Sequence, residues 1–268
     1  MLTVHTPADD LRSDIECGVV VRLGHAGSVS RFPAMPRAML TWAWGADGVA
    51  GLHFHALPTQ PMQQHHPQAF QALGWVLPPV TAARLLGPST GAMANASLPW
   101  AELAGDAEAH RVLAELQDAA TPQRQLQALQ DSLRRVLSRG PERVRSARTT
   151  DLQRLCLEVG RDGVQAAQAL GTSPRQLERR CRALLGLAPK QFQRMTRVHG
   201  VLSTAVRCHR IPDADAALAA GYYDQSHLAR EVRELAGAPL RELLAGARAD
   251  GDWWPLATQR LGALRHHR

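Results

Sequence analysis

Two short stretches in the C-terminal half of the sequence gather side chains that could contact a polyanion. Their polar and charged members are Arg175, Gln176, Glu178, Arg179 and Arg182 in the first stretch, and Gln225, Ser226, His227 and Arg230 in the second. Arginine suits both phosphate groups and base edges, whereas glutamine and serine suit base edges, so this set is typical of a nucleic-acid interface. Glu178 differs, because its carboxylate repels phosphate. We expect it to form an i,i+4 ion pair with Arg182, although a cytosine amino group is an alternative partner.

These stretches belong to the two copies of an internal repeat. The first copy reads VQAAQALGTSPRQLERRCRALLG (164–186), and the second reads ADAALAAGYYDQSHLAREVRELAG (214–237). Gly171 and Gly221 lie 50 positions apart in the two copies. Each copy places an alanine where two helices can cross closely, then a glycine for a left-handed turn, and then a leucine for the core. This order of residues is typical of a helix-turn-helix unit.

The residues after each turn indicate where the second helix of each unit begins. Ser173 with Pro174, and Asp224 in the second copy, are suited to cap a helix N-terminus. We therefore predict recognition helices at about residues 174–185 and 225–235, whose exposed N-terminal side chains could reach base edges in a major groove.

Residues 150–245 resemble the DNA-binding region of the AraC/XylS family of bacterial transcriptional regulators. The resemblance is strongest in AALAAGYYDQSHLAREVRELAG (216–237), which follows the family's alanine, glycine-aromatic and Asp-Gln-Ser-His pattern. The segment PKQFQRMTRVHGVLSTAV (189–206) resembles the family's linker helix, which would span about 27 Å. Cys181 and Val232 depart from the pattern, because the family usually has phenylalanine at both positions. The resemblance implies a sequence-specific transcription factor with two recognition helices in successive major grooves.

The resemblance also implies the partners. Double-stranded DNA at an operator or promoter is the main one. RNA polymerase, a small-molecule effector and a second copy of the chain, forming a homodimer, are further partners that a regulator of this kind could have.

The distribution of charge fits a polyanion partner for the C-terminal half. Residues 1–140 contain 10 basic and 11 acidic side chains, whereas residues 141–268 contain 21 basic and 13 acidic ones. The net charge of +7 therefore comes from the C-terminal half. Nucleic acid is the commonest partner of such a half, although an arginine-rich solvated surface would have the same charge.

The N-terminal half has a different pattern of residues, with short apolar runs separated by glycine and proline. Beta-branched and aromatic residues favour strands in the first runs, and helical spacing follows them. The expected strands are 17–23, 38–44, 49–56 and 69–77, and the expected helices are 80–86, 100–103, 107–116 and 122–137. This half is therefore predicted to be a mixed α+β domain.

Part of the N-terminal half is also similar to a known domain. Residues 15–118 faintly resemble an uncharacterised domain found attached to such regulators. The matching pieces are 36–44, GLHFHALP (51–58) and LPWAELAG (98–105). This resemblance implies a sensory or assembly role.

We therefore expect a multidomain chain. An α+β domain for effector sensing or dimerisation would occupy residues 1–138, and a linker would occupy 139–149, where the sequence is polar and contains Gly-Pro. An all-α DNA-binding domain with two helix-turn-helix units joined by a linker helix would follow in 150–245. Residues 246–268 would form a C-terminal tail, whose Trp253-Trp254 pair we expect to pack against the last helix.

Histidines in the N-terminal half raise the possibility of a metal site. His53 and His55 would share one face of a strand, with His65 and His66 nearby. A mononuclear site of this type also needs a downstream glutamate, and residues 17–101 contain none. We therefore expect no metal there, although a histidine group could still contact an effector. The alternative function is an enzyme-like N-terminal domain that binds a metal or small molecule, with an accessory DNA-binding domain.

The sequence contains none of the common catalytic signatures. G-x-S-x-G, a phosphate loop and H-E-x-x-H are all missing, so we expect no enzymatic activity, no catalytic residues and no cofactor. Four scattered cysteines without a CxxC motif fit a reducing compartment. Because no apolar run is long enough for a membrane span and no secretory signal is visible, we expect a cytoplasmic protein without a membrane partner.

Overall fold

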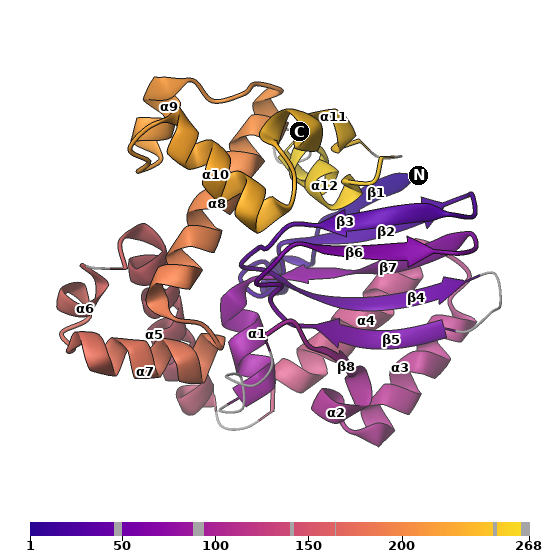
Figure 1. Cartoon of the computed structure of the whole chain (residues 1–268). Coiled ribbons are helices and arrows are strands. Elements are labelled where there is room, and N and C mark those ends of the chain that lie inside the picture. The colour runs from indigo at the N-terminus through magenta and orange to yellow at the C-terminus, as the bar shows by residue number, and fades with distance from the viewer. Residues whose placement is uncertain (46–49, 88–93, 140–141, 164, 249–250, 264–268) are drawn as a thin grey trace.

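The computed structural model describes residues 1–45, 50–87, 94–139, 142–163, 165–248 and 251–263. The strands in these ranges are β1 (Leu2–His5), β2 (Cys17–Leu23), β3 (Ser28–Phe32), β4 (Ala38–Gly45), β5 (Ala50–His55), β6 (Met62–His66), β7 (Phe70–Leu77) and β8 (Ser97–Pro99). Six of them form one antiparallel sheet in the order β1-β2-β7-β4-β5-β8, and β3 pairs with β6 in a smaller sheet. The N-terminal half is therefore built on two sheets (Figure 1).

The predicted strands are confirmed, and the structure adds others. Strand β2 has the predicted bounds, β4 is one residue longer, β7 is one residue shorter and β5 ends one residue early. Residue 49, where this strand was predicted to begin, lies outside the described residues. Strands β1, β3, β6 and β8 were not predicted. In β6 the sequence MQQHH offers no apolar alternation, because four of its five side chains are exposed.

Helices cover one face of the large sheet. They are a short 3-10 turn (Asp9–Leu11), α1 (Pro79–Leu86), α2 (Trp100–Ala104), α3 (Asp106–Asp118) and α4 (Pro122–Leu137). Alternate residues of the strands, such as Leu40 and Phe54, point to this face and are fully buried. Trp75 belongs to the same face, where its indole Nε1 donates a hydrogen bond to the backbone oxygen of Leu126 in α4 (2.9 Å).

The C-terminal half consists of helices. They are α5 (Glu142–Arg161), α6 (Ala166–Ala169), α7 (Pro174–Leu185), α8 (Pro189–Cys208), α9 (Ala214–Ala219), α10 (Gln225–Ala236), α11 (Leu240–Gly246) and α12 (Trp254–Ala263). Figure 1 shows α8 running between the unit of α6 and α7 and the unit of α9 and α10. The predicted class, an α+β half followed by a helical half with two helix-turn-helix units and a linker helix, is confirmed. No helix in the described ranges has both the length and the apolar character needed to cross a bilayer.

The predicted linker is largely helical instead. Helix α4 ends at Leu137 and α5 begins at Glu142, so residues 142–149 of the predicted linker 139–149 belong to α5, and residues 140 and 141 lie outside the described part. Arginine, glutamate and alanine are good helix formers, and we gave the polar composition of this run too much weight. The domain boundaries themselves remain a prediction.

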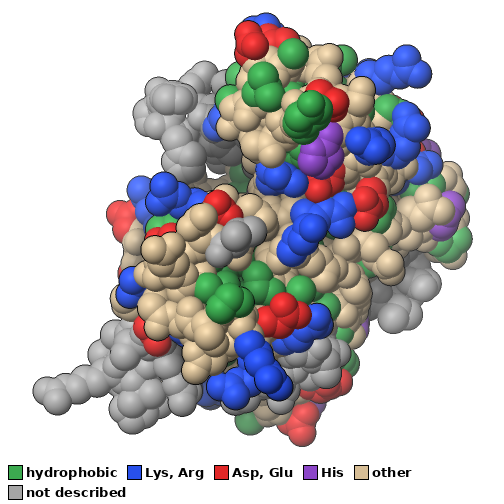
Figure 2. Space-filling model, turned by 60° about the vertical axis from the view of Figure 1, so that its left-hand side comes forward, with side chains coloured by type: hydrophobic (Ala, Val, Ile, Leu, Met, Phe, Trp, Pro, Cys, Tyr) green, Lys and Arg blue, Asp and Glu red, His purple; other side chains and the backbone are tan. Residues whose placement is uncertain are grey.

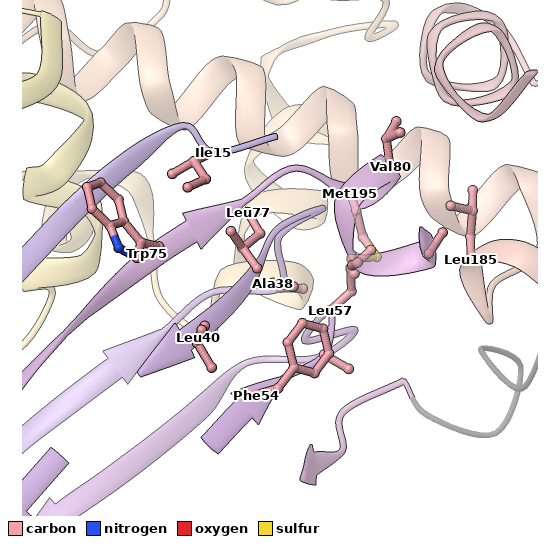
Figure 3. Packing of buried hydrophobic residues seen from close by; sticks show 14 of the residues in the cluster. Ile15, Ala38, Leu40, Phe54, Leu57, Trp75, Leu77, Val80, Leu185 and Met195 are labelled. Carbon is pink, nitrogen blue, oxygen red and sulfur yellow. The ribbon is translucent and has the colours of Figure 1, made fainter. Parts of the chain in front are cut away.

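One hydrophobic cluster connects the two halves. Figure 3 shows Phe54 and Leu77 of the sheet and Val80 of α1 in a cluster that also contains Leu185 of α7 and Met195 of α8. Met195 is completely buried. The helix-turn-helix half therefore shares buried apolar contacts with the N-terminal half.

Candidate nucleic-acid interface

The two repeat copies fold as two helix-turn-helix units with the predicted turns. Helices α6 and α7 form the first unit, and α9 and α10 form the second. Gly171 and Gly221 have φ angles of +60° and +79°, in the left-handed region that favours glycine. Ala167 and Ala217, which precede these glycines by four residues, are buried where the helices cross.

Both second helices have the predicted N-terminal caps. In α7 the Ser173 hydroxyl accepts a hydrogen bond from the backbone N–H of Gln176 (3.3 Å), and the Gln176 side-chain oxygen accepts one from the backbone N–H of Ser173 (3.0 Å). In α10 a carboxylate oxygen of Asp224 accepts a hydrogen bond from the backbone N–H of His227 (2.6 Å). These caps fix where each recognition helix begins, and the partial positive charge of a helix N-terminus suits a phosphate.

The residues predicted in α7 are all exposed, but they do not all present an available side chain. Gln176 is held by the cap, and its side-chain oxygen also accepts a hydrogen bond from the Thr172 hydroxyl (3.0 Å). Glu178 and Arg182 form the expected i,i+4 ion pair at 2.9 Å. Arg175 and Arg179 are exposed cations of the first recognition helix.

In α10 the predicted residues divide in a similar way. The Gln225 side-chain amide donates a hydrogen bond to the backbone oxygen of Pro212 (2.9 Å). His227 is half-buried, and its ring meets the Tyr222 ring edge-on at 5.3 Å between centroids. Ser226 and Arg230 are exposed and line a shallow groove on the outer face of the helix.

The structure adds candidates that we did not predict. Arg233 and Glu234 line the same shallow groove as Ser226 and Arg230, one turn further along α10. Tyr223 is 85% exposed and directly precedes the cap residue of this helix. The sequence GYYD (221–224) contains a signal for this exposed position. Tyr223 lies between the turn and the cap residue Asp224, where its side chain has little room to reach the core.

Side chains of the linker helix hold the second unit in place. Glu231 of α10 is buried and accepts hydrogen bonds from Arg194 (2.8 Å) and Arg197 (3.0 Å) of α8. The Arg197 guanidinium also lies over the Tyr222 ring, 4.3 Å from its centroid. Burial alone would raise the pKa of Glu231, but the hydrogen bond from Arg194 and the charge and hydrogen bonds of Arg197 hold it below its usual value. At 20 residues, α8 is about 30 Å long.

The surface over both units carries charges of both signs. Figure 2 brings this side of the molecule forward and shows Lys and Arg side chains on its upper and lower parts, with Asp and Glu side chains among them. Acidic side chains of the two units form ion pairs with arginine in Arg182–Glu178 and Arg210–Asp213, with N–O distances of 2.9 Å and 2.5 Å.

A separate cavity of about 380 Å³ lies in the N-terminal half, between the large sheet and the β3–β6 sheet. Its floor includes Gly51, Ala43 and Ala72, which lie in register on the neighbouring strands β5, β4 and β7. Three small side chains in one row across a sheet leave space that larger residues would fill. The apolar lining is completed by Phe32, Met35, Met39, Met62, Phe70 and Trp254.

The predicted histidine group is divided by the structure. His53 and His55 both line the cavity, with ring centroids 6.3 Å apart, and the Nε2 atom of His55 lies 2.8 Å from the Thr41 hydroxyl. His65 is exposed, and His66 is buried with its Nε2 atom 2.8 Å from the Ser30 hydroxyl. Burial, followed by the nearby His53, lowers the pKa of His55 to about 4, so its ring is neutral at physiological pH. Among the described residues, no three His, Cys, Asp or Glu side chains are placed to hold a metal ion.

One comparison with known proteins identifies a domain in the C-terminal half. Residues 166–246 match a family described as a helix-turn-helix domain. A search of curated proteins found no match. Among solved structures, ToxT from Vibrio cholerae in its P21 form is similar, with 10% sequence identity and a TM-score of 0.46 over 85% of this chain and 97% of ToxT. Wild-type ToxT of V. cholerae strain SCE256 bound to an unsaturated fatty acid gives 10% identity and a TM-score of 0.45 over 91% and 94% of the two chains.

The matched residues include both helix-turn-helix units and the helix between them. The predicted resemblance of this region is therefore confirmed. The C-terminal part of this chain belongs to the AraC-type helix-turn-helix domains, and the chain is a DNA-binding transcription regulator.

Proposed function

We propose that the chain recognises a specific operator by placing α7 and α10 in successive major grooves on one face of the duplex. The observation that carries this proposal is the pair of capped recognition helices joined by α8. Successive major grooves are about 34 Å apart, which is close to the length of that helix. The hydrogen bonds of Glu231 with the two arginines of α8 support a fixed orientation of the second unit.

Within this proposal, exposed side chains that keep no internal bond are the best base readers. Arg175 and Arg179 would act from α7, and Ser226 and Arg230 from α10. Gln225 would have to release the carbonyl of Pro212 before its amide could pair with both atoms of an adenine edge. Gln176 would act as the capping residue that fixes the start of α7, and Glu178 would hold Arg182 as its ion-pair partner.

Selection of bound sequences from a random DNA pool, followed by gel shift on the selected site, tests this proposal. Arg179→Ala and Arg230→Ala should each weaken binding of the selected site by about five- to a hundredfold, because each removes a base or phosphate contact. Arg124→Ala is the matched control, since Arg124 is exposed on α4 of the N-terminal half. Equal binding by all three variants would contradict the assignment of the interface.

We also propose that the N-terminal half binds a small-molecule effector in the 380 Å³ cavity. The cavity is mostly apolar and has a few polar side chains, which is the usual character of a ligand site. A ligand that binds the folded state raises the melting temperature, so a compound library can be screened by thermal unfolding. Ala43→Phe, which fills the row of small residues, should abolish any shift that comes from this cavity. A shift that survives in this variant would place the ligand elsewhere.

A further inference from the structure

The chain after the helix-turn-helix domain returns to the N-terminal half. Helix α12 lies against β1 and β3, as Figure 1 shows at the N-terminal edge of the sheet. The backbone oxygen of Asp252 accepts a hydrogen bond from the backbone N–H of Arg31 in β3 (2.8 Å). Trp253 and Trp254 are both buried. Trp253 lies close to Gly246 at the end of α11, whereas Trp254 turns to the N-terminal half.

Trp254 is part of the wall of the cavity. Its indole Nε1 donates a hydrogen bond to the Ser30 hydroxyl (2.8 Å), and its ring meets Phe32 edge-on at 5.7 Å between centroids. Ser30 and Phe32 also line the cavity. Because Ser30 accepts from the indole, its own proton can be donated to His66, whose Nε2 atom is 2.8 Å away. Trp254, which follows the DNA-binding domain in the sequence, is thereby held against the smaller sheet.

The same cavity borders the loops that touch the end of the second recognition helix. Met35 and Met62 line the cavity, and their chain neighbours contact α10. The backbone N–H of Ala34 donates a hydrogen bond to the backbone oxygen of Leu235 (2.6 Å), near the C-terminus of α10. A Cβ atom placed on Gly237 would lie 3.0 Å from the Cβ atom of Pro61. The segment from Leu235 to Trp254 is therefore attached to the cavity wall at both of its ends.

The chemistry of the lining restricts the ligand. Phe32, Phe70 and Trp254 offer aromatic faces and edges to a planar apolar body. Arg37, which forms an ion pair with Glu16 (2.5 Å), is the cation of the described lining, and no Asp or Glu is among the lining residues. A cationic ligand would find no counter-charge there, whereas a neutral or anionic one is compatible.

We propose that Trp254 is a ligand-contacting residue of this cavity, that residues 252–258 form its lid, and that a planar, largely apolar, neutral or anionic ligand acts on α10 through this lid. This inference rests on the proposed effector function. A bound ligand contacts Trp254 and the loops beside Ala34 and Pro61 together, so it changes how the end of α10 is held. DNA affinity then depends on whether the cavity is occupied.

The full chain can test this inference with the fluorescent dye 1-anilinonaphthalene-8-sulfonate, a planar anionic probe. Trp254→Phe and Ser30→Ala each remove the indole–hydroxyl hydrogen bond, from opposite sides. Each should weaken dye binding by about fivefold, because the ring at position 254 loses the hydrogen bond that fixes it in the cavity wall. Trp75→Phe is the matched control, because it also removes a buried indole that donates a hydrogen bond, but Trp75 lies outside the lid and does not line the cavity. Ala43→Phe should abolish dye binding to the cavity, and circular dichroism shows whether each variant is folded.

Coupling to DNA is measured by fluorescence anisotropy on the selected site, with and without dye. Saturating dye should change the Kd of the wild-type chain for DNA by about fivefold or more, and should leave that of Trp254→Phe nearly unchanged.

The inference would be overturned if both Trp254→Phe and Ser30→Ala bound the dye and coupled it to DNA binding as the wild-type chain does. Dye binding that survives Ala43→Phe would overturn it too. Lost DNA binding by dye-free Trp254→Phe would also overturn it, because the tail would then belong to the DNA-binding fold itself. If Trp254→Phe does not fold, Ser30→Ala decides the question. Dye-free wild-type binding to DNA tests the proposed DNA-binding function independently.

Discussion

The buried histidine of the linker helix should make the protein sensitive to acid. His199 of α8 is 7% exposed, and burial, together with the charge of nearby Arg37, lowers its pKa to about 3. The unfolded chain binds a proton there with the ordinary pKa of 6.5, so the unfolded state carries more protons between these two values. The free energy of unfolding must therefore fall as the pH falls below 6.5.

The magnitude follows from the proton linkage. Each pH unit below 6.5 costs about 1.4 kcal/mol for one such group, so His199 should lower the free energy of unfolding by about 2 kcal/mol between pH 7 and pH 5. His55, with a pKa of about 4, acts in the same direction. Substituting His199 should remove its share of the pH dependence and leave that of His55.

Urea unfolding at constant ionic strength, followed by tryptophan fluorescence from pH 5 to pH 7.5, measures this effect. Between pH 7 and pH 5, the free energy of unfolding should fall by about 2 kcal/mol less in His199→Gln than in the wild-type chain. This difference does not depend on the stability of the variant at pH 7. His110→Gln, at an exposed position on α3, is the control and should follow the wild-type curve. Parallel curves for His199→Gln and the wild-type chain would refute the reasoning, because they would mean that His199 titrates alike in both states.

Three other changes test the interface. Glu231→Gln should lower the free energy of unfolding by about 2 kcal/mol or more in urea, since it leaves half-buried Arg197 without its anion and leaves Arg194 with the exposed Glu234 alone; Glu234→Gln should lower the free energy of unfolding by less than about 1 kcal/mol, and equal losses would argue that Glu231 does not hold the second unit. Ser173→Ala should lower the free energy of unfolding by about 1 kcal/mol, because α7 loses its N-terminal cap. An unchanged free energy of unfolding in urea would contradict the capping geometry. The logarithm of the DNA association constant should fall against the logarithm of salt concentration with a slope of about −4 to −5 if about 5 phosphates are contacted, whereas a flat response would exclude an electrostatic interface.

The helix-turn-helix half could be predicted because its signals are local. The glycines of the turns, the caps at Ser173 and Asp224, and the ion pair of Glu178 with Arg182 each involve residues at most four positions apart or single backbone conformations. The role of Gln176 was predicted only in part, since its side chain suits both a base edge and a capping box. The structure puts it in the capping box.

The cavity and its lid could not be predicted, because they depend on contacts between distant positions. The row of Gly51, Ala43 and Ala72 appears only once the strand register is known. Trp254 and Ser30 are separated by 224 positions. The same argument explains the missed strand β6, whose polar residues form a strand because β3 pairs with it.

The return of the tail to β3 has a consequence for how the protein is synthesised. Domains generally fold as units during translation, with the N-terminal one first. Here Ser30 is buried with a hydrogen bond from Trp254, which is synthesised 224 residues later. The smaller sheet of the N-terminal half therefore cannot complete its buried contacts until residue 254 has been synthesised. A nascent chain stalled before residue 252 should hold an open cavity whose aromatic walls are exposed to chaperones.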